Sequence, residues 1–165
     1  SAPGAGTTMR LMFAVPTAIP AEPGQPAAPL AVPSRLRLLL VDDDPILLKS
    51  LRDALETDGH IIVAANGGEQ GITAFRMAHD RNEPFAAVIT DLGMPYVDGR
   101  RVTAAVKEIS RATPVIMLTG WGRRLVSEGD IPPHVDRVLA KPPKLREVRE
   151  ALAQLCRPTP PEAGA

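Results

Sequence analysis

Four short motifs carry side chains that could bind a metal ion and transfer a phosphoryl group. They are Asp42-Asp43-Asp44, Asp91, Thr119-Gly120 and Lys141-Pro142. Carboxylates brought into one pocket repel one another, so at least one takes up a proton unless a cation is present. Mg²⁺ suits such a pocket because it binds one or two carboxylates and leaves room for phosphate oxygens. With a lysine charge and a hydroxyl donor, these groups suit phosphoryl transfer onto a carboxylate.

This chemistry requires the chain to bring the motifs together, and the hydropathy pattern indicates how. Short, continuous apolar runs are typical of strands covered on both faces. Four such runs and a weaker fifth occur along the chain, at Leu36–Val41, Ile61–Ala64, Ala86–Thr90, Val115–Thr119 and Arg137–Ala140. The chemical motifs lie at the ends of the first, third, fourth and fifth runs.

Between these runs, apolar residues recur at helical spacing. Asp44-Pro45 predicts an N-cap and a first helical residue, and Gly59 predicts a helix stop. The clearest stripes are Leu47, Leu51, Ala54 and Leu55; Val102, Ala105, Val106 and Ile109; and Leu145, Val148, Leu152 and Leu155, with weaker patterns at 68–80 and 121–129. Five βα units predict an α/β fold, a doubly wound parallel sheet whose functional groups collect at the carboxyl ends of the strands.

Each motif alone also has an ordinary structural interpretation. An acidic cluster commonly caps a helix or lies in a solvated loop, and we expect Asp44 to be only a cap. A threonine at a strand end is commonly a β-former, and a single Lys-Pro carries little information. Because all four motifs converge on one edge of the predicted sheet, the sequence favours a functional site.

The composition excludes several classes of protein. The chain has 165 residues, with 19 Lys+Arg against 19 Asp+Glu, a balance that argues against a general nucleic-acid or membrane-surface binder. Cys156 is the only cysteine, which rules out a disulfide framework and a multi-cysteine metal site. No apolar run approaches the roughly 20 residues of a membrane-spanning helix, and the first residues do not resemble a signal peptide. We therefore expect a soluble protein of the cytoplasm.

The distribution of proline divides the chain into parts. Seven of the 18 prolines precede residue 36, and a Pro/Ala-rich segment of this kind favours an extended linker over a packed core. Most of the other prolines lie at the edges of apolar segments, where they mark element boundaries. We predict a linker at 16–35, a folded unit at 36–156 and a disordered tail at 157–165.

In this order, the motifs resemble those of the receiver domains of two-component signalling. The residues from Leu39 to Pro45 are similar to the family's acidic strand end, and Asp91 to Gly99 resembles its phosphoacceptor loop, with Asp, Met-Pro and Asp-Gly at the family's spacing. Thr119-Gly120 resembles the switch hydroxyl with its small neighbour. The resemblance covers 36–156 and implies a flavodoxin-like (βα)5 fold with strand order 2-1-3-4-5.

The resemblance implies a role for each acidic residue. Asp91 would accept a phosphoryl group from a phosphohistidine. Asp42, Asp43 and Asp91 would hold Mg²⁺, with the backbone carbonyl of Gly93 as a further ligand. Such a domain catalyses its own phosphorylation and slow hydrolysis without being a turnover enzyme.

The resemblance also implies a switch, which departs from the usual pattern here. Thr119 would hydrogen-bond the phosphoryl oxygens, Lys141 would pair with them, and Gly120 would leave access to the site. Family members commonly place an aromatic residue three positions before the lysine, where this chain has Val138. We therefore expect only a modest conformational change on phosphorylation.

The first residues resemble the end of the ATP-binding domain of sensor histidine kinases. A Gly-x-Gly-Thr motif spans Gly4 to Thr7, and a strand-like alternation follows at Met9, Leu11, Phe13 and Val15. This resemblance implies that 1–15 is the last strand of a kinase domain, disordered here, and that 36–156 is the C-terminal receiver of a hybrid histidine kinase. The alternative is a tail without function.

Two other functions compete with that of a phosphoacceptor. A Mg²⁺-dependent phosphatase with an aspartyl nucleophile usually needs a second Asp two residues later, where Gly93 stands. The other alternative is an interaction module that works without phosphate. Such a module does not need the acidic residues, Thr119 or Lys141, and the presence of the complete set argues against it.

The expected partners follow from the resemblance. No histidine in the chain has the flanking pattern of a phosphodonor, so the phosphate would come from a histidine kinase domain in cis or in trans, with a histidine phosphotransfer protein as a possible further partner. We expect no nucleic acid or membrane contact, and a monomer or weak dimer. A parent protein could be membrane-tethered through other parts.

Overall fold

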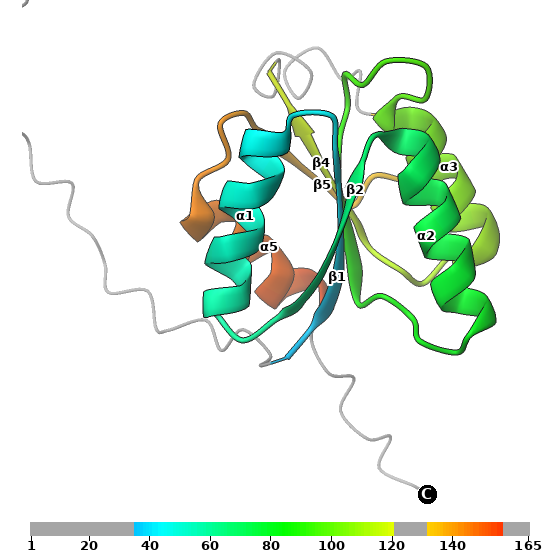
Figure 1. Ribbon diagram of the computed structural model, residues 1–165, viewed down its shortest axis with the longest axis horizontal. Coiled ribbons are helices and arrows are strands. Elements are labelled where there is room, and N and C mark those ends of the chain that lie inside the picture. The colour runs from blue at the N-terminus through cyan, green and yellow to red at the C-terminus, as the bar shows by residue number, and fades with distance from the viewer. Residues whose placement is uncertain (1–34, 121–131, 157–165) are drawn as a thin grey trace, which may run out of the picture.

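The computed structural model describes residues 35–120 and 132–156, which form one parallel sheet between two layers of helices (Figure 1). The sheet order is β2-β1-β3-β4-β5, as the resemblance implies. Helices α1 and α5 cover one face, and α2 and α3 cover the other (Figure 1). The strands are β1 (Arg37–Asp42), β2 (Ile61–Asn66), β3 (Ala87–Asp91), β4 (Val115–Thr119) and β5 (Arg137–Ala140). The helices are α1 (Pro45–Thr57), α2 (Gly68–Asp80), α3 (Gly99–Ile109) and α5 (Leu145–Leu155).

Local chemistry sets the ends of α1 as predicted. The Asp44 carboxylate accepts the backbone N–H groups of Ile46 and Leu47, which satisfies two donors that the first turn leaves open. Pro45 occupies the first helical position, and Gly59 ends the segment with φ of 89°. That left-handed conformation costs glycine little, and it turns the chain into β2.

The hydrophobic core lies in two layers, one on each face of the sheet. Strands β1 and β3 are buried almost throughout because helices cover both of their faces. On one side Leu38, Leu40 and Ile89 pack with α1 and α5, and on the other Leu39 and Val88 pack with α2 and α3. The central strands are thereby held in a fixed position, and their carboxyl ends carry the predicted functional residues.

Three sequence predictions need correction or fall outside the described residues. The run at Ile61–Ala64 is not buried on both faces: Ile61 is 48% exposed and Ala64 is also exposed, because β2 lies at a sheet edge. Strands β1 and β3 each begin and end one residue later than predicted, so Asp42 and Asp91 are the last residues of their strands, and β2 continues two residues beyond the predicted Ala64, to Asn66. The segments 1–15, 16–34 and 157–165 and the predicted helix at 121–129 lie outside the described residues. None of the described helices has the length and apolar character needed to cross a bilayer.

Candidate functional site

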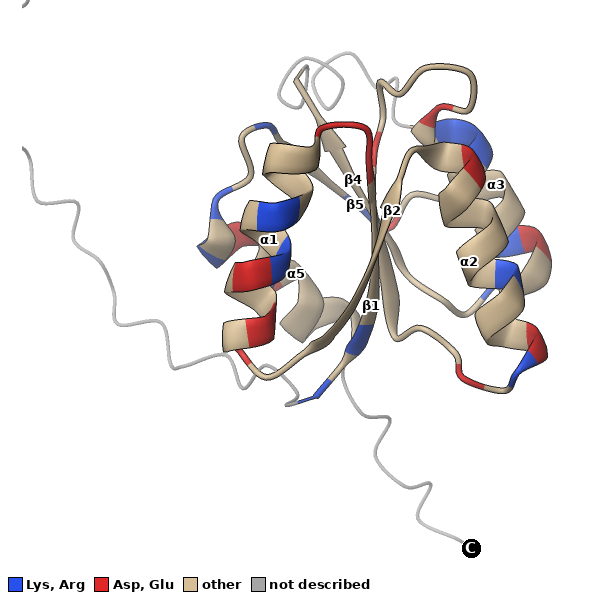
Figure 2. Ribbon diagram, in the orientation of Figure 1, with Lys and Arg blue, Asp and Glu red and all other residues tan. Residues whose placement is uncertain are grey.

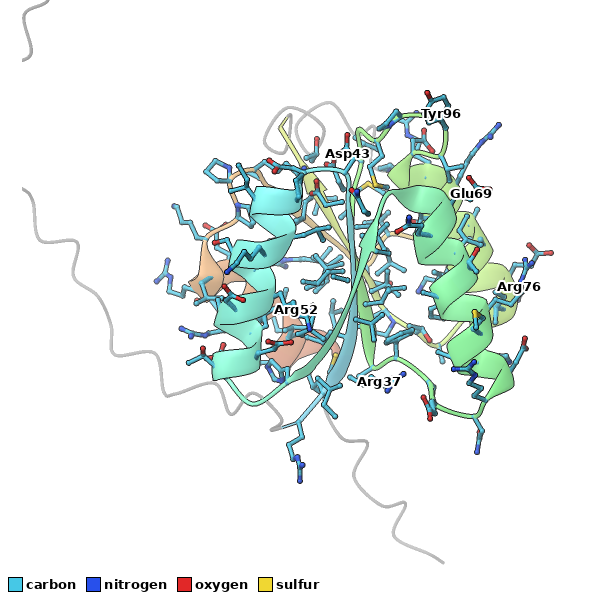
Figure 3. All side chains as sticks on the ribbon, in the orientation of Figure 1. Arg37, Asp43, Arg52, Glu69, Arg76 and Tyr96 are labelled. Carbon is cyan, nitrogen blue, oxygen red and sulfur yellow. The ribbon has the colours of Figure 1, made fainter. Side chains whose placement is uncertain are left out.

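Parallel pairing brings the predicted site residues to one edge of the sheet. Asp42 ends β1, Asp91 ends β3 and Thr119 ends β4, while Lys141 directly follows β5. The pairs Asp91–Leu118 and Thr119–Ala140 lie in register on adjacent strands, which sets the strand ends at nearly the same height. The acidic loop between β1 and α1 marks this carboxyl edge, where Asp43 is labelled (Figures 2 and 3).

Lys141 connects the two buried carboxylates of this edge. Its Nζ lies 2.7 Å from Oδ2 of Asp42 and 3.0 Å from Oδ1 of Asp91. Asp42 and Asp91 are 3% and 6% exposed. Charges buried to this degree need a partner, because removal from water costs each of them several kcal/mol. One lysine between two carboxylates leaves the cluster with a net negative charge.

Burial and pairing shift the protonation equilibria of this cluster in opposite ways. Burial raises the pKa of the Asp42 carboxyl above its ordinary value, and the contacts with Lys141 and the backbone N–H of Asp44 offset this only in part. Burial alone would lower the pKa of Lys141, but the hydrogen bonds and charges of Asp42 and Asp91 outweigh it and raise that pKa. The lysine therefore stays protonated, while burial makes the charged form of the Asp42 carboxyl less favourable than it is in water.

The acidic residues of this edge fit a hard divalent cation. One carboxylate oxygen from each of Asp42, Asp43 and Asp91 can be chosen so that the three lie within 4.8 Å of one another. Oδ2 of Asp42 is buried without a donor in hydrogen-bond geometry, although Lys141 is its ion-pair partner. Asp43 is exposed, so the cluster is open on one side to water and to a ligand. A set of oxygen ligands in which Asp42 and Asp91 are buried and Asp43 is exposed is compatible with Mg²⁺.

The loop that follows Asp91 is held against the end of β3 by the positions of its Met-Pro and Asp-Gly motifs. Met94 is buried in the core, and Asp98 caps α3 by accepting the N–H of Arg101 at 3.0 Å. The N–H of Gly99 donates to the carbonyl of Leu92 at 3.0 Å. A Cβ at Gly99 would collide with the backbone oxygen of Asp91, so only glycine allows this approach. The Met-Pro and Asp-Gly motifs thus hold the loop against Asp91 by steric fit.

The remaining predicted residues lie around the same edge with different surroundings. Thr119 is 1% exposed, and its carbonyl accepts the backbone N–H of Lys141 at 2.9 Å. At Gly93 and Gly120 a Cβ would meet at most one described atom within 4 Å, which is Oδ2 of Asp91 beside Gly93. Val138 is half-buried within β5 opposite Met117.

Sequence reasoning missed two residues near the site. Gly68 begins α2 at a point where a Cβ would overlap Val97 of the acceptor loop, so α2 packs directly on that loop. Tyr96 has φ of 64° and is 97% exposed at the loop tip (Figure 3). The Gly67-Gly68 pair could have signalled a close approach, but the orientation of Tyr96 has no local sequence signal.

Comparison with known proteins assigns the family. The response regulator receiver domain family matches residues 38–153, most of the chain, and the chain therefore belongs to this family. The response regulator MprA of Mycolicibacterium vanbaalenii is 33% identical over 132 residues, which cover 79% of this chain and 54% of MprA. The sensor protein EvgS of Escherichia coli O157:H7 is 28% identical over 157 residues, 94% of this chain and 13% of EvgS.

A solved structure supports the fold. The response regulator TrrA of Thermotoga maritima, in complex with Mg²⁺-BeF, matches with a TM-score of 0.62 and 25% identity, covering 73% of this chain and 98% of TrrA. The chain spans only 54% of MprA and 13% of EvgS. It is thus a receiver domain with a phosphorylatable aspartate pocket of the two-component type, and the predicted phosphoacceptor function is confirmed at that level.

Proposed function

We propose that Asp91 is the residue that accepts the phosphoryl group, taken from a phosphohistidine of another domain or protein. A carboxylate oxygen of Asp91 attacks phosphorus in line with the scissile P–N bond. The acyl phosphate P–O bond forms as the P–N bond breaks, and the departing imidazole takes up a proton. The position of Asp91 at the end of β3, beside Asp42 and Lys141, is the observation that carries this assignment.

Mg²⁺ is the cofactor that the acidic cluster supports. Asp42, Asp43 and Asp91 would hold it, with the Gly93 carbonyl as a further ligand. When bound, the ion neutralises charge on the phosphoryl oxygens and on the crowded carboxylates. Of these residues, Asp43 faces water, and the buried Oδ2 of Asp42 has the Lys141 ammonium beside it at 2.7 Å, which leaves a lone pair for a metal.

Lys141 and Thr119 stabilise the product in this proposal. The ammonium group of Lys141 contacts Asp91 at 3.0 Å before reaction, so it can shift to a phosphoryl oxygen once the carboxylate has become an acyl phosphate. The Thr119 hydroxyl would donate to a second oxygen, with Gly120 keeping the approach open. With Val138 in place of an aromatic residue, we expect the accompanying movement of β4 and β5 to be small.

Beryllofluoride binding tests the acceptor assignment without a partner protein. Wild type and Asp91→Asn are titrated with BeF₃⁻ in the presence and absence of Mg²⁺, and amide chemical shifts of the residues around Thr119 and Lys141 are followed. We expect Mg²⁺-dependent shifts in the wild type and none in Asp91→Asn. Equal shifts in both proteins would remove Asp91 from the mechanism. A large movement of the segment after β4 would contradict the modest switch.

We also infer that the chain comes from a hybrid histidine kinase. The support is the Gly-x-Gly-Thr segment at 4–7 and the match to the sensor protein EvgS, which extends over 94% of the chain and so beyond the receiver family match at 38–153. In this proposal 1–15 is the last kinase strand, 16–35 a linker, 36–156 the receiver and 157–165 a tail. The donor is then the kinase in cis, with a phosphotransfer protein as a further partner, in the cytoplasm. A coding sequence without a kinase ATP-binding domain before Ser1 would overturn it.

A further inference from the structure

The two edge strands of the sheet differ in how they resist pairing with another strand. β5 has four residues, begins with Arg137 and runs into Lys141-Pro142. Charge, proline and short length are the features that keep an edge strand from adding a neighbour. β2 spans six residues, Ile61–Asn66, without charge or proline, and its register with β1 is unbroken over all six. β2 is therefore an unprotected edge.

The direction of the backbone groups on β2 follows from its bonds to β1. The N–H of Ile61 donates to the carbonyl of Leu36 at 2.8 Å, and that of Gly67 donates to the carbonyl of Asp42 at 3.1 Å. In a parallel ladder, successive residues direct their N–H and C=O groups to opposite sides of the strand. The residues at even positions of β2 thus point these groups away from β1.

These outward groups form the exposed edge. Of the three residues concerned, Asn66 has its N–H bonded to the side chain of Gln70 at 3.1 Å. No second strand pairs with β2 within the described part of the chain. Ile62 is buried and Ala64 is exposed, so the N–H and C=O groups of Ala64 are the ones most open to another strand, and pairing would satisfy them.

Grooves on both sides of β2 leave room for an added strand. One, of about 440 Å³, lies toward α2 and includes Thr73 and Met77, and the other, of about 430 Å³, lies toward α1. Ala64 lines both grooves, so it lies between them. Ile61 and Met77 are 48% and 46% exposed beside this edge, and β2 lies between α1 and α2 (Figure 1).

The charges beside β2 are arranged so that the surface is complementary to itself. The α1 groove is lined by Lys49 and Arg52 nearer the helix start and by Asp53 and Glu56 nearer its end. A two-fold axis perpendicular to the sheet, between β2 and the β2 of a second copy, would place α1 antiparallel to its copy on the same face of the sheet. The basic pair of each copy then lies opposite the acidic pair of the other. Arg52 lies on the side of α1 that faces β2 (Figure 3).

We propose that the β2 edge is a self-association surface, on which a second copy of this chain adds its β2 antiparallel and extends the sheet. Ala64 would lie opposite Ala64 of the second copy, with each N–H donating to the carbonyl of the other. The Lys49–Asp53 and Arg52–Glu56 pairs are exposed, so they can exchange partners between copies at little desolvation cost. The contact is small, and we expect the association to be weak. It does not depend on the phosphoacceptor site.

Sedimentation equilibrium from about 10 µM to 1 mM tests this surface. Ala64→Lys sets two like charges at the centre of the contact, and we expect at least a tenfold rise in the dissociation constant. Ala104→Lys is the matched control, because Ala104 is an exposed alanine on α3, away from β2. It should associate as the wild type does, and circular dichroism checks that both variants are folded.

A charge exchange makes the test specific for the α1 contact. The double variant Lys49→Glu/Arg52→Glu places acidic groups opposite acidic groups and should weaken association. Adding Asp53→Lys and Glu56→Lys reverses the whole pattern and should restore it. A wild type that stays monomeric to about 1 mM, or an Ala64→Lys variant that associates equally well, would overturn the proposal. A monomer whose Ala64 amide is protected from exchange would show that another part of the same chain covers the edge, which also overturns it.

Discussion

The carboxyl and amino ends of the strands use charge in opposite ways. At the carboxyl end, Asp42, Asp91 and Lys141 are gathered in a largely buried cluster with unequal charge. At the amino end, charges join separate elements in matched pairs. Arg149 on α5 binds both carboxylate oxygens of Asp58 at the end of α1, at 2.7 Å each. The pair of Arg149 and Asp58 joins α1 and α5, whereas the cluster at the carboxyl end keeps an excess of negative charge.

A second amino-end pair shows the same structural use of charge. Oδ2 of Asp136 accepts Lys107 Nζ at 2.8 Å and the backbone N–H of Val115 at 2.7 Å. One carboxylate thus fixes α3 to the starts of β4 and β5. The comparison teaches that a receiver keeps unfavourable buried charge at one end and gains stability from satisfied charge at the other.

Removing the carboxylate of Asp91, the acceptor that we propose, should have the largest effect. We expect Asp91→Asn to abolish covalent phosphorylation by a small-molecule phosphodonor, because an amide oxygen is a far weaker nucleophile than a carboxylate. The measurement is intact-protein mass spectrometry after incubation with acetyl phosphate and Mg²⁺. Asp98→Asn is the control, since asparagine caps α3 as well as aspartate does. Phosphate still found on Asp91→Asn would mean that another residue is the acceptor.

Removing the lysine between the carboxylates should cost the most stability. In Lys141→Met two buried carboxylates lose their counter-charge, and we expect the free energy of unfolding to fall by about 2 kcal/mol. This loss of stability is smaller than the loss expected for a fully buried ion pair, because the Lys141 side chain is 23% exposed. Urea unfolding with and without Mg²⁺ measures it, and Mg²⁺ should recover part of the loss. Lys144→Met, at an exposed pair with Glu147, is the control. Equal stability of the two variants would refute the compensating role of Lys141.

Breaking the pair of Asp136 and Lys107 at the amino end should lower the stability of the fold without changing the rate of phosphorylation. Asp136→Ala removes the acceptor for Lys107 and for the N–H of Val115, and we expect a loss of about 1 kcal/mol in the free energy of unfolding. Phosphorylation of the folded protein should proceed at the wild-type rate. A phosphorylation defect in folded Asp136→Ala would show that the two ends of the sheet are coupled.

The smallest effect is expected from the pH dependence of His60. This side chain is 5% exposed, and its Nδ1 accepts the N–H of Leu36 at 3.3 Å. Burial lowers the pKa of His60, with Asp58 opposing the shift and Arg149 adding to it. The folded state therefore binds fewer protons than the unfolded state. The contribution of His60 to the free energy of unfolding is complete above about pH 6.5 and is lost as pH falls below it.

The slope of unfolding free energy between pH 7 and pH 5 measures this contribution. His60→Gln keeps an acceptor for the backbone of Leu36 and should flatten the slope. His79→Gln is the control at an exposed position and should leave the slope unchanged. If His60→Gln keeps the full slope, another group carries the pH dependence.

The sequence by itself determined the local features of this protein. The Asp44 cap, the proline at the start of α1 and the strand runs of β4 and β5 could be read directly, because each depends on a few neighbouring residues. The βα alternation predicted a parallel sheet, and parallel strands bring their carboxyl ends together. The convergence of Asp91, Thr119 and Lys141 on one edge was therefore predictable from order and spacing.

Only the tertiary structure decided which contacts join distant segments. Asp58 and Arg149 are 91 residues apart and meet because α1 and α5 share one face of the sheet. The burial of His60 and the exposed edge at β2 depend on which strands become neighbours, and an apolar run such as Ile61–Ala64 reads the same in the centre of a sheet as at its edge. Hydropathy records how apolar a segment is, whereas burial depends on what the rest of the chain places against it.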